Sequence, residues 1–135
     1  MHICAALVKA AAEFLMAMAT KDASSYYYSV STLNVKPENQ AKVVEFFTRV
    51  GEATERLEPA AKIYRWYKVQ DKDQFVFIEK FASEADYRAH QKSEHVQGLY
   101  REYIDYITEP FAFYPIDTSE ERLIGGLRGN EMLLR

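Results

Sequence analysis

His90 is the residue of this 135-residue chain best suited to move protons near neutral pH. An unperturbed imidazole titrates near ~6.5, so it can accept and release protons under physiological conditions. Asp86 precedes His90 by four residues, and this spacing places both side chains on one face of a helix. A carboxylate there would orient the ring, so the pair predicts a general acid–base site with His90 as the base.

Other residues could complete a site around His90. Glu79 and His95 lie close to it in the sequence, and aromatic side chains chosen by strand alternation could form walls for a flat ring. These walls are assigned to Tyr28, Trp66, Phe77 and Tyr100. Each residue also has an ordinary structural alternative. The histidines could be surface residues at a helix end, Glu79 could pair with Lys80 or Arg88, and the aromatic residues could belong to the core or to an interface.

The sequence predicts neither a bound metal nor an organic cofactor. His90 and His95 are five residues apart, rather than the four that place two ligands on one helix face, and His2 is remote. Cys4 is the single cysteine of the chain, which excludes an internal disulfide and a thiolate cluster. A reducing, cytoplasmic location is therefore expected, although removal of a leader or secretion remains an alternative.

Composition narrows the range of partners. The net charge of −3 arises from interspersed acids and bases without a basic run, so nucleic acid is not an expected partner. Aromatic residues make up 14% of the chain, which suits a large core, a buried interface or a pocket for a flat ligand. The length corresponds to one domain.

The two ends of the chain are predicted to lie outside that domain. Residues 1–25 are interpreted as an amphipathic helix and a linker, because apolar residues recur every three or four positions, while Lys9 and Glu13 interrupt the run that a secretory signal requires. The helix is too short and too charged to span a bilayer. Residues 117–135 contain three glycines that disfavour a helix, and they are predicted to form an extension over a partner subunit or a pocket mouth.

Hydrophobic periodicity predicts a ferredoxin-like α+β domain over residues 26–116. Ser83 is a candidate helix cap, with Asp86 three residues later. The order strand, helix, strand, strand, helix, strand predicts a four-stranded antiparallel sheet with helices on one face. The expected strands are residues 26–36, 61–70, 74–82 and 111–116, and the expected helices are residues 38–57, 83–91 and 93–106.

Both faces of this sheet carry apolar residues. In the third strand, Phe75, Phe77 and Phe81 alternate with Val76 and Ile78. Helices can cover only one of these faces, so the other is expected to pack against a second copy of the chain. The sequence therefore predicts a homodimer built sheet to sheet.

Residues 26–116 resemble the antibiotic biosynthesis monooxygenase (ABM) family of dimeric α+β barrels. The resemblance rests on Glu58-Pro59, Ile78-Glu79-Lys80-Phe81, the Ser83 cap, and Ala89-His90 followed by Ser93 and His95. It implies a fold shared by cofactor-free oxygenases of anthrones or quinols, heme-degrading enzymes and an isomerase of a phosphorylated diketone. The heme-degrading branch uses Asn, Trp and His where this chain has Ser31, Phe81 and Tyr100, so heme degradation is not expected.

Two classes of function follow from the residues and the resemblance. The first is a cofactor-independent monooxygenase in which His90 deprotonates a small phenol, anthrone or quinol that then reacts with O2, or an isomerase of a small dicarbonyl on the same fold. The second is a dimeric ligand-binding or stress-response module without turnover. A fold alone does not choose between these functions.

Overall fold

The computed structural model describes residues 26–125 of the chain. The helix predicted within residues 1–25 and the last ten residues of the predicted C-terminal extension lie outside the described part. The only structure in the described portion of that extension is a short 3-10 helix, η4 (Glu121–Leu123).

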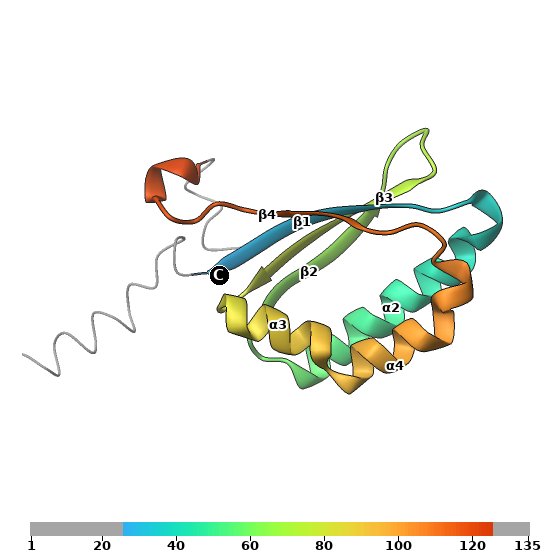
Figure 1. Cartoon of the computed structure of the whole chain (residues 1–135), viewed down its shortest axis with the longest axis horizontal. Coiled ribbons are helices and arrows are strands. Elements are labelled where there is room, and N and C mark those ends of the chain that lie inside the picture. The colour runs from blue at the N-terminus through green and yellow to red at the C-terminus, as the bar shows by residue number, and fades with distance from the viewer. Residues whose placement is uncertain (1–25, 126–135) are drawn as a thin grey trace, which may run out of the picture.

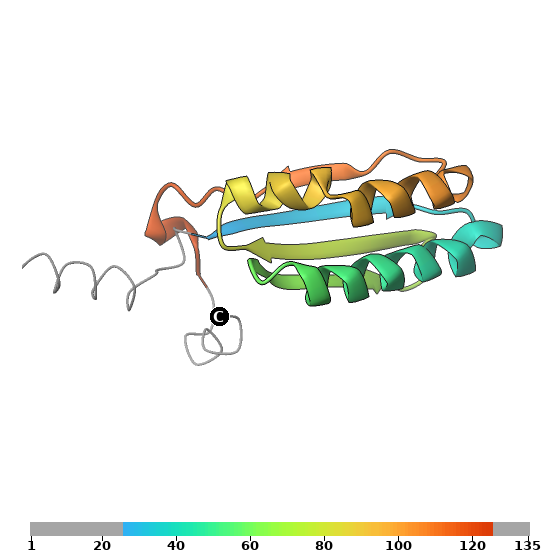
Figure 2. The ribbon, with the colours of Figure 1, turned by 90° about the horizontal axis from the view of Figure 1, so that it is seen from below.

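One antiparallel sheet forms a layer against three helices (Figure 1). The strands are β1 (Tyr27–Asn34), β2 (Ala61–Lys68), β3 (Gln74–Phe81) and β4 (Ala112–Pro115), ordered β2-β3-β1-β4. The helices are α2 (Gln40–Leu57), α3 (Glu84–Lys92) and α4 (Glu94–Tyr103), with the short 3-10 helices η2 (Pro37–Asn39) and η3 (Ile104–Tyr106). Figure 2 shows α2 along the β2 side of the sheet and α3 and α4 along the β4 side. The predicted ferredoxin-like arrangement is confirmed, and most element boundaries shift by one to three residues.

Serine caps set the path of the chain through α3 and α4. The Ser83 side chain accepts a hydrogen bond from the Asp86 backbone N–H and begins α3. Ser93 has an extended backbone (φ −62°, ψ 147°) that ends α3, and its side chain accepts from the Val96 N–H at the start of α4. Ser93 therefore breaks what could have been one continuous helix, and the residues on either side of it no longer follow a single helical spacing.

The core lies between the helices and the sheet. Alternation along β3 turns Phe75, Phe77, Glu79 and Phe81 towards the helices, and all four are buried. Phe47 of α2 is fully buried and contacts Phe77 edge to face, with ring centroids 4.5 Å apart. Glu79 is the one acid in this row of aromatic residues, and its position there places a carboxyl group inside the domain.

The opposite face of the sheet has no helical cover. Ile78 is 41% exposed, and Tyr67 and Tyr114 of the flanking strands are more than half exposed. Both faces of the sheet are therefore apolar, as the alternation predicted. Lys80 also lies on this face but is buried, with its ammonium 4.1 Å from the ring centroid of Tyr26 and 5.4 Å from that of Tyr28.

Within residues 26–125, no helix combines the length and apolar character that crossing a membrane requires.

Candidate active site

Glu58 holds the His90 ring in a fixed orientation. Glu58 follows the last residue of α2, and its Oε2 lies 2.7 Å from His90 Nδ1. A carboxylate can only accept hydrogen bonds, so Nδ1 carries the proton of the neutral ring and Nε2 carries the lone pair. Burial lowers the pKa of His90, although the hydrogen bond to Glu58 opposes this effect. The ring is therefore neutral at neutral pH, with Nε2 free to act as a base.

Glu79 lies beside the basic nitrogen of His90. Its Oε1 is 3.8 Å from His90 Nε2, and its Oε2 accepts a hydrogen bond of 3.3 Å from the Ser29 hydroxyl on β1. Burial raises the pKa of Glu79 to about 7, the charge of Glu58 adds to the rise, and the Ser29 bond opposes it. Near neutral pH this carboxyl group can therefore either donate or accept a proton.

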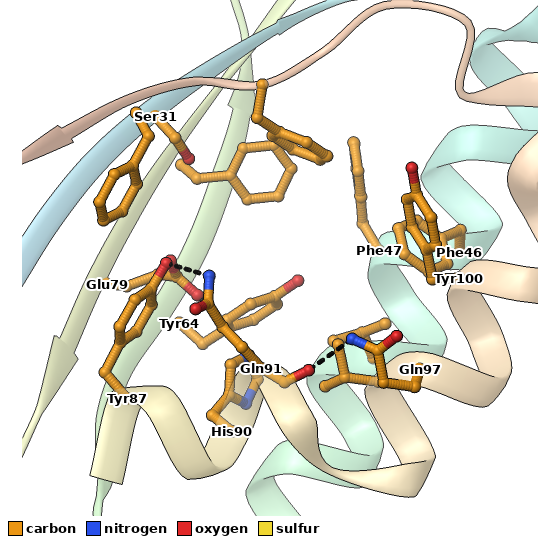
Figure 3. A pocket seen from close by; sticks show the side chains of 15 residues that line it. Ser31, Phe46, Phe47, Tyr64, Glu79, Tyr87, His90, Gln91, Gln97 and Tyr100 are labelled. Carbon is orange, nitrogen blue, oxygen red and sulfur yellow. Dashed lines mark hydrogen bonds and ion pairs between the residues drawn. The ribbon is translucent and has the colours of Figure 1, made fainter. Parts of the chain in front are cut away.

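A cavity of about 320 Å³ lies between the sheet and the helices above these two groups. Figure 3 shows side chains from both layers surrounding the space. The volume falls at the lower end of the range of about 300–1,000 Å³ for small-molecule pockets. Its walls are mainly apolar and aromatic, with a few polar groups among them. The lining residues are Ser31, Phe46, Phe47, Val50, Tyr64, Phe77, Glu79, Tyr87, His90, Gln91, Val96, Gln97, Tyr100, Phe111 and Phe113.

Two tyrosines supply hydroxyl groups to this cavity: Tyr87, which is buried, and Tyr64, which is partly buried. Burial raises the pKa of both Tyr64 and Tyr87, and the charge of Glu79 raises both further, so the phenols keep their protons. Tyr87 accepts a hydrogen bond of 2.6 Å from Gln91 Nε2, as the dashed line in Figure 3 shows. A protonated hydroxyl in an enclosed site can stabilise a developing oxyanion.

Four of the residues predicted from the sequence meet at this cavity: Phe77, Glu79, His90 and Tyr100. Glu79 is not paired with Arg88, which binds Glu84 at 3.0 Å, and Lys80 lies on the other face of the sheet. The structural role proposed as an alternative for Glu79 therefore does not account for its position.

The other predicted residues lie elsewhere. Tyr28 is on the uncovered face of the sheet, because the β1 residues that face the helices alternate with it and include Ser29 and Ser31. Trp66 packs against the core rings of Phe47 and Phe75, with centroids 5.5 and 6.1 Å away, and does not line the cavity. Tyr28 and Trp66 thus take positions that the sequence had left as structural alternatives.

Asp86 does not reach the His90 ring. Its carboxylate accepts a hydrogen bond of 2.7 Å from the Ser83 hydroxyl, while its backbone N–H donates to the same serine. This reciprocal cap holds the Asp86 side chain at the start of α3. The partner predicted for His90 is therefore corrected from Asp86 to Glu58.

His95 reaches the same carboxylate from α4. Its Nε2 lies 2.6 Å from Glu58 Oε2, so one oxygen atom contacts both histidines. The five-residue spacing did not predict this, because the break at Ser93 removes the helical relation between His90 and His95. Glu58, His90 and His95 form the group within residues 26–125 whose ligand atoms could surround a metal ion.

Glu58, Tyr64 and Tyr87 are site residues that the sequence did not single out. The signal for Glu58 was present in the Glu58-Pro59 pair, which marks the point where α2 must end. A contact that joins residues 32 positions apart has no periodic signature, and only the packing of α3 against the end of α2 reveals it.

Comparison with solved structures identifies proteins of the same architecture. A candidate antibiotic biosynthesis monooxygenase from Caulobacter crescentus CB15 matches with a TM-score of 0.65 at 16% identity, covering 69% of this chain and 89% of that one. A candidate antibiotic biosynthesis monooxygenase from Bacteroides thetaiotaomicron VPI-5482 matches with a TM-score of 0.63 at 21% identity, covering 79% of this chain and 98% of that one. Rv0793 from Mycobacterium tuberculosis matches with a TM-score of 0.62 at 18% identity, covering 69% of this chain and 94% of that one. At these identities the similarity concerns the fold. A comparison with curated proteins found no match.

The fold and the cavity between sheet and helices define a ferredoxin-like α+β domain with a small-molecule pocket. The family model for antibiotic biosynthesis monooxygenases matches residues 27–102, which is more than half of the chain. The chain therefore belongs to the antibiotic biosynthesis monooxygenase family.

Proposed function

We propose that the protein is a cofactor-independent monooxygenase that oxidises a small phenol, anthrone or quinol with O2. The observation that carries the proposal is the His90 ring at the edge of an aromatic cavity, held through Nδ1 by Glu58, which leaves the lone pair of the neutral ring on Nε2. Such a ring can take a proton from an enolisable or phenolic substrate. Membership of the family supports this class of reaction.

The reaction balances without an added reductant. His90 Nε2 removes a proton from the substrate, and the resulting carbanion or phenolate passes one electron to O2. Recombination of the two radicals forms a carbon–oxygen bond and a peroxide anion, which accepts the proton from His90. Loss of water from the hydroperoxide leaves a carbonyl group in the product, so the substrate CH2 becomes C=O and O2 supplies one atom each to the product and to water.

The cavity favours each of these steps. Aromatic walls can stack against a flat ring, and a substrate that fills the cavity displaces water from the place where the carbanion and the peroxide form. The hydroxyl groups of Tyr64 and Tyr87 can stabilise the oxyanion. Glu79 can exchange a proton with His90 once their separation of 3.8 Å shortens to hydrogen-bond distance.

Oxygen uptake tests the proposal directly. Full-length protein in buffer with a chelator should consume one O2 per carbonyl product with at least one member of a panel containing anthrone, 1-naphthol and hydroquinones. An isomerase of dicarbonyls would instead exchange substrate protons with deuterated solvent and consume no O2. Exchange without uptake would replace the oxygenase with that alternative. Binding in the cavity with neither reaction would indicate a binding module.

We propose further that the uncovered face of the sheet forms a homodimer. Ile78, Tyr67 and Tyr114 leave a broad apolar surface that a second copy could cover. Analytical ultracentrifugation of the parent protein at micromolar concentration should give a mass twice that of one chain. Ile78→Lys should shift the measured mass towards that of the monomer. Leu57 is the last residue of α2 and is 53% exposed, so it does not belong to the sheet. Leu57→Lys is therefore the matched control and should leave the mass unchanged. A monomeric parent protein would contradict the proposal.

A further inference from the structure

Three side chains from separate segments meet beside the cavity, and His90 is the one of them that lines it. Glu58 follows α2, His90 lies near the end of α3, and His95 lies in the first turn of α4. Glu58 Oε2 is 2.7 Å from His90 Nδ1 and 2.6 Å from His95 Nε2, and the three ligand atoms lie within 4.8 Å of one another. We propose that this Glu58–His90–His95 cluster binds a divalent transition-metal ion such as Zn²⁺.

The donor set suits such an ion. Two imidazole nitrogens and one carboxylate oxygen are ligands that Zn²⁺, Cu²⁺ and Ni²⁺ accept, and three protein ligands leave a coordination position for water. The ring protons now shared with Glu58 would have to leave those two nitrogens when the ion enters, and a neutral ring can carry its proton on the other nitrogen instead. Zinc bonds of about 2.0–2.2 Å need ligand atoms slightly further apart than these hydrogen bonds hold them. The flexible Glu58 side chain can supply that movement.

Burial and local structure show that the cluster is a built site rather than a chance surface group. The His90 side chain is 5% exposed, Glu58 15% and His95 17%, so an ion would be largely enclosed yet reachable from solvent. Ser93 fixes the relation of the two histidines, because it caps α4 and its hydroxyl donates to the His90 carbonyl oxygen at 2.6 Å.

Glu79 provides a second, independent feature of metal sites. Its Oε1 lies 3.8 Å from His90 Nε2, the ring nitrogen that does not face the cluster. Metal-bound histidines commonly direct their other nitrogen to a carboxylate, which fixes the tautomer and strengthens the ligand. At 3.8 Å the two atoms are too far apart for a hydrogen bond, and a small movement of the Glu79 side chain would make it this supporting carboxylate.

Metal binding would also regulate the chemistry, and this part of the inference rests on the proposed function. For an ion to bind His90 Nδ1, the proton of the neutral ring must move from Nδ1 to Nε2. The ring could then no longer accept a proton from a substrate in the cavity. The ion and the substrate proton would compete for one imidazole, so Zn²⁺ should inhibit oxygen uptake.

Calorimetric titration of chelator-stripped, full-length protein with Zn²⁺ tests the site. His2→Ala and Cys4→Ser are included in the parent protein to remove other ligands. The parent should bind one ion per chain. Glu58→Gln and His95→Gln should each weaken binding by about tenfold or more, since changes in the supporting shell alone cost about 10–100-fold. Glu94→Gln, an exposed neighbour in the first turn of α4, should bind as the parent does.

Two results would overturn the site: no binding, or binding that Glu58→Gln and His95→Gln leave unchanged. Circular dichroism of each variant separates loss of ligand from loss of fold. Oxygen uptake then tests the regulatory part separately. Full uptake by the zinc-loaded parent would overturn inhibition, whereas a metal-free parent that binds Zn²⁺ but never consumes O2 would count against the proposed function and leave the ion site in place.

Discussion

His90→Asn is expected to lower the rate of oxygen uptake by about 10²–10⁴-fold, the usual contribution of a positioned general base. The asparagine amide can still donate to Glu58 from near the place of Nδ1, but no lone pair replaces Nε2. Fold and cavity should therefore survive while proton removal is lost. Initial rates on an oxygen electrode, in the presence of a chelator, measure the effect.

Asp86→Asn is the matched control for His90→Asn. Asparagine can still accept the hydrogen bond from Ser83, so the cap of α3 should remain, and the residue does not contact the cavity. Its rate should stay within a few-fold of the parent. Equal losses in Asp86→Asn and His90→Asn would contradict the assignment of Glu58 as the group that orients the ring.

Glu79→Gln is expected to raise the free energy of unfolding at pH 8 by about 3 kcal/mol. Burial raises the pKa of Glu79 from 4.5 to about 7, so the folded protein holds a proton that the unfolded chain has already lost. The stability that this carboxyl group contributes is complete below pH 4.5 and is lost as the pH rises to about 7, at about 1.4 kcal/mol per pH unit. Glutamine stays neutral throughout and can still accept from Ser29.

Urea unfolding of the parent and Glu79→Gln, in chelator and at several pH values between 4.5 and 8, measures this difference. The free energy of unfolding of Glu79→Gln should exceed that of the parent by an amount that grows as the pH rises above about 4.5 and stays constant above about pH 7. Glu84→Gln, at an exposed position on α3, should show no such divergence. A gap between parent and Glu79→Gln that does not change with pH would show that the Glu79 carboxyl group is ionised in the folded protein like any surface acid.

The fold could be predicted because each element carries its own local signal. Alternation along residues 74–81 identified β3, Pro37 and Pro59 bounded the first helix, and Ser83 marked the start of α3. Few topologies are compatible with the order of these elements, so the ferredoxin-like sheet could be predicted from that order. The break at Ser93 was also expected, although its effect on the two histidines was not.

The site could be predicted only in part, because its contacts are not local. His90 and Glu79 stand out by residue type, but the i, i+4 rule joined His90 to Asp86 without allowing for the Ser83 cap that competes for the same carboxylate. Strand alternation predicts which face of the sheet a side chain lies on, but not whether it lies at the cavity. Trp66 therefore shares the helix-facing side of β2 with Tyr64, yet it packs into the core while Tyr64 lines the cavity.

The proposed chemistry depends on which nitrogen of His90 carries the proton. Two-bond ¹H–¹⁵N NMR correlation of the metal-free protein at pH 7.5 reports this directly, with His90→Asn used to assign the ring. The account predicts a neutral ring with its proton on Nδ1 and an unprotonated Nε2. A ring protonated on Nε2, or a fully charged imidazolium at that pH, would contradict it, because neither form could take a proton from a substrate in the cavity.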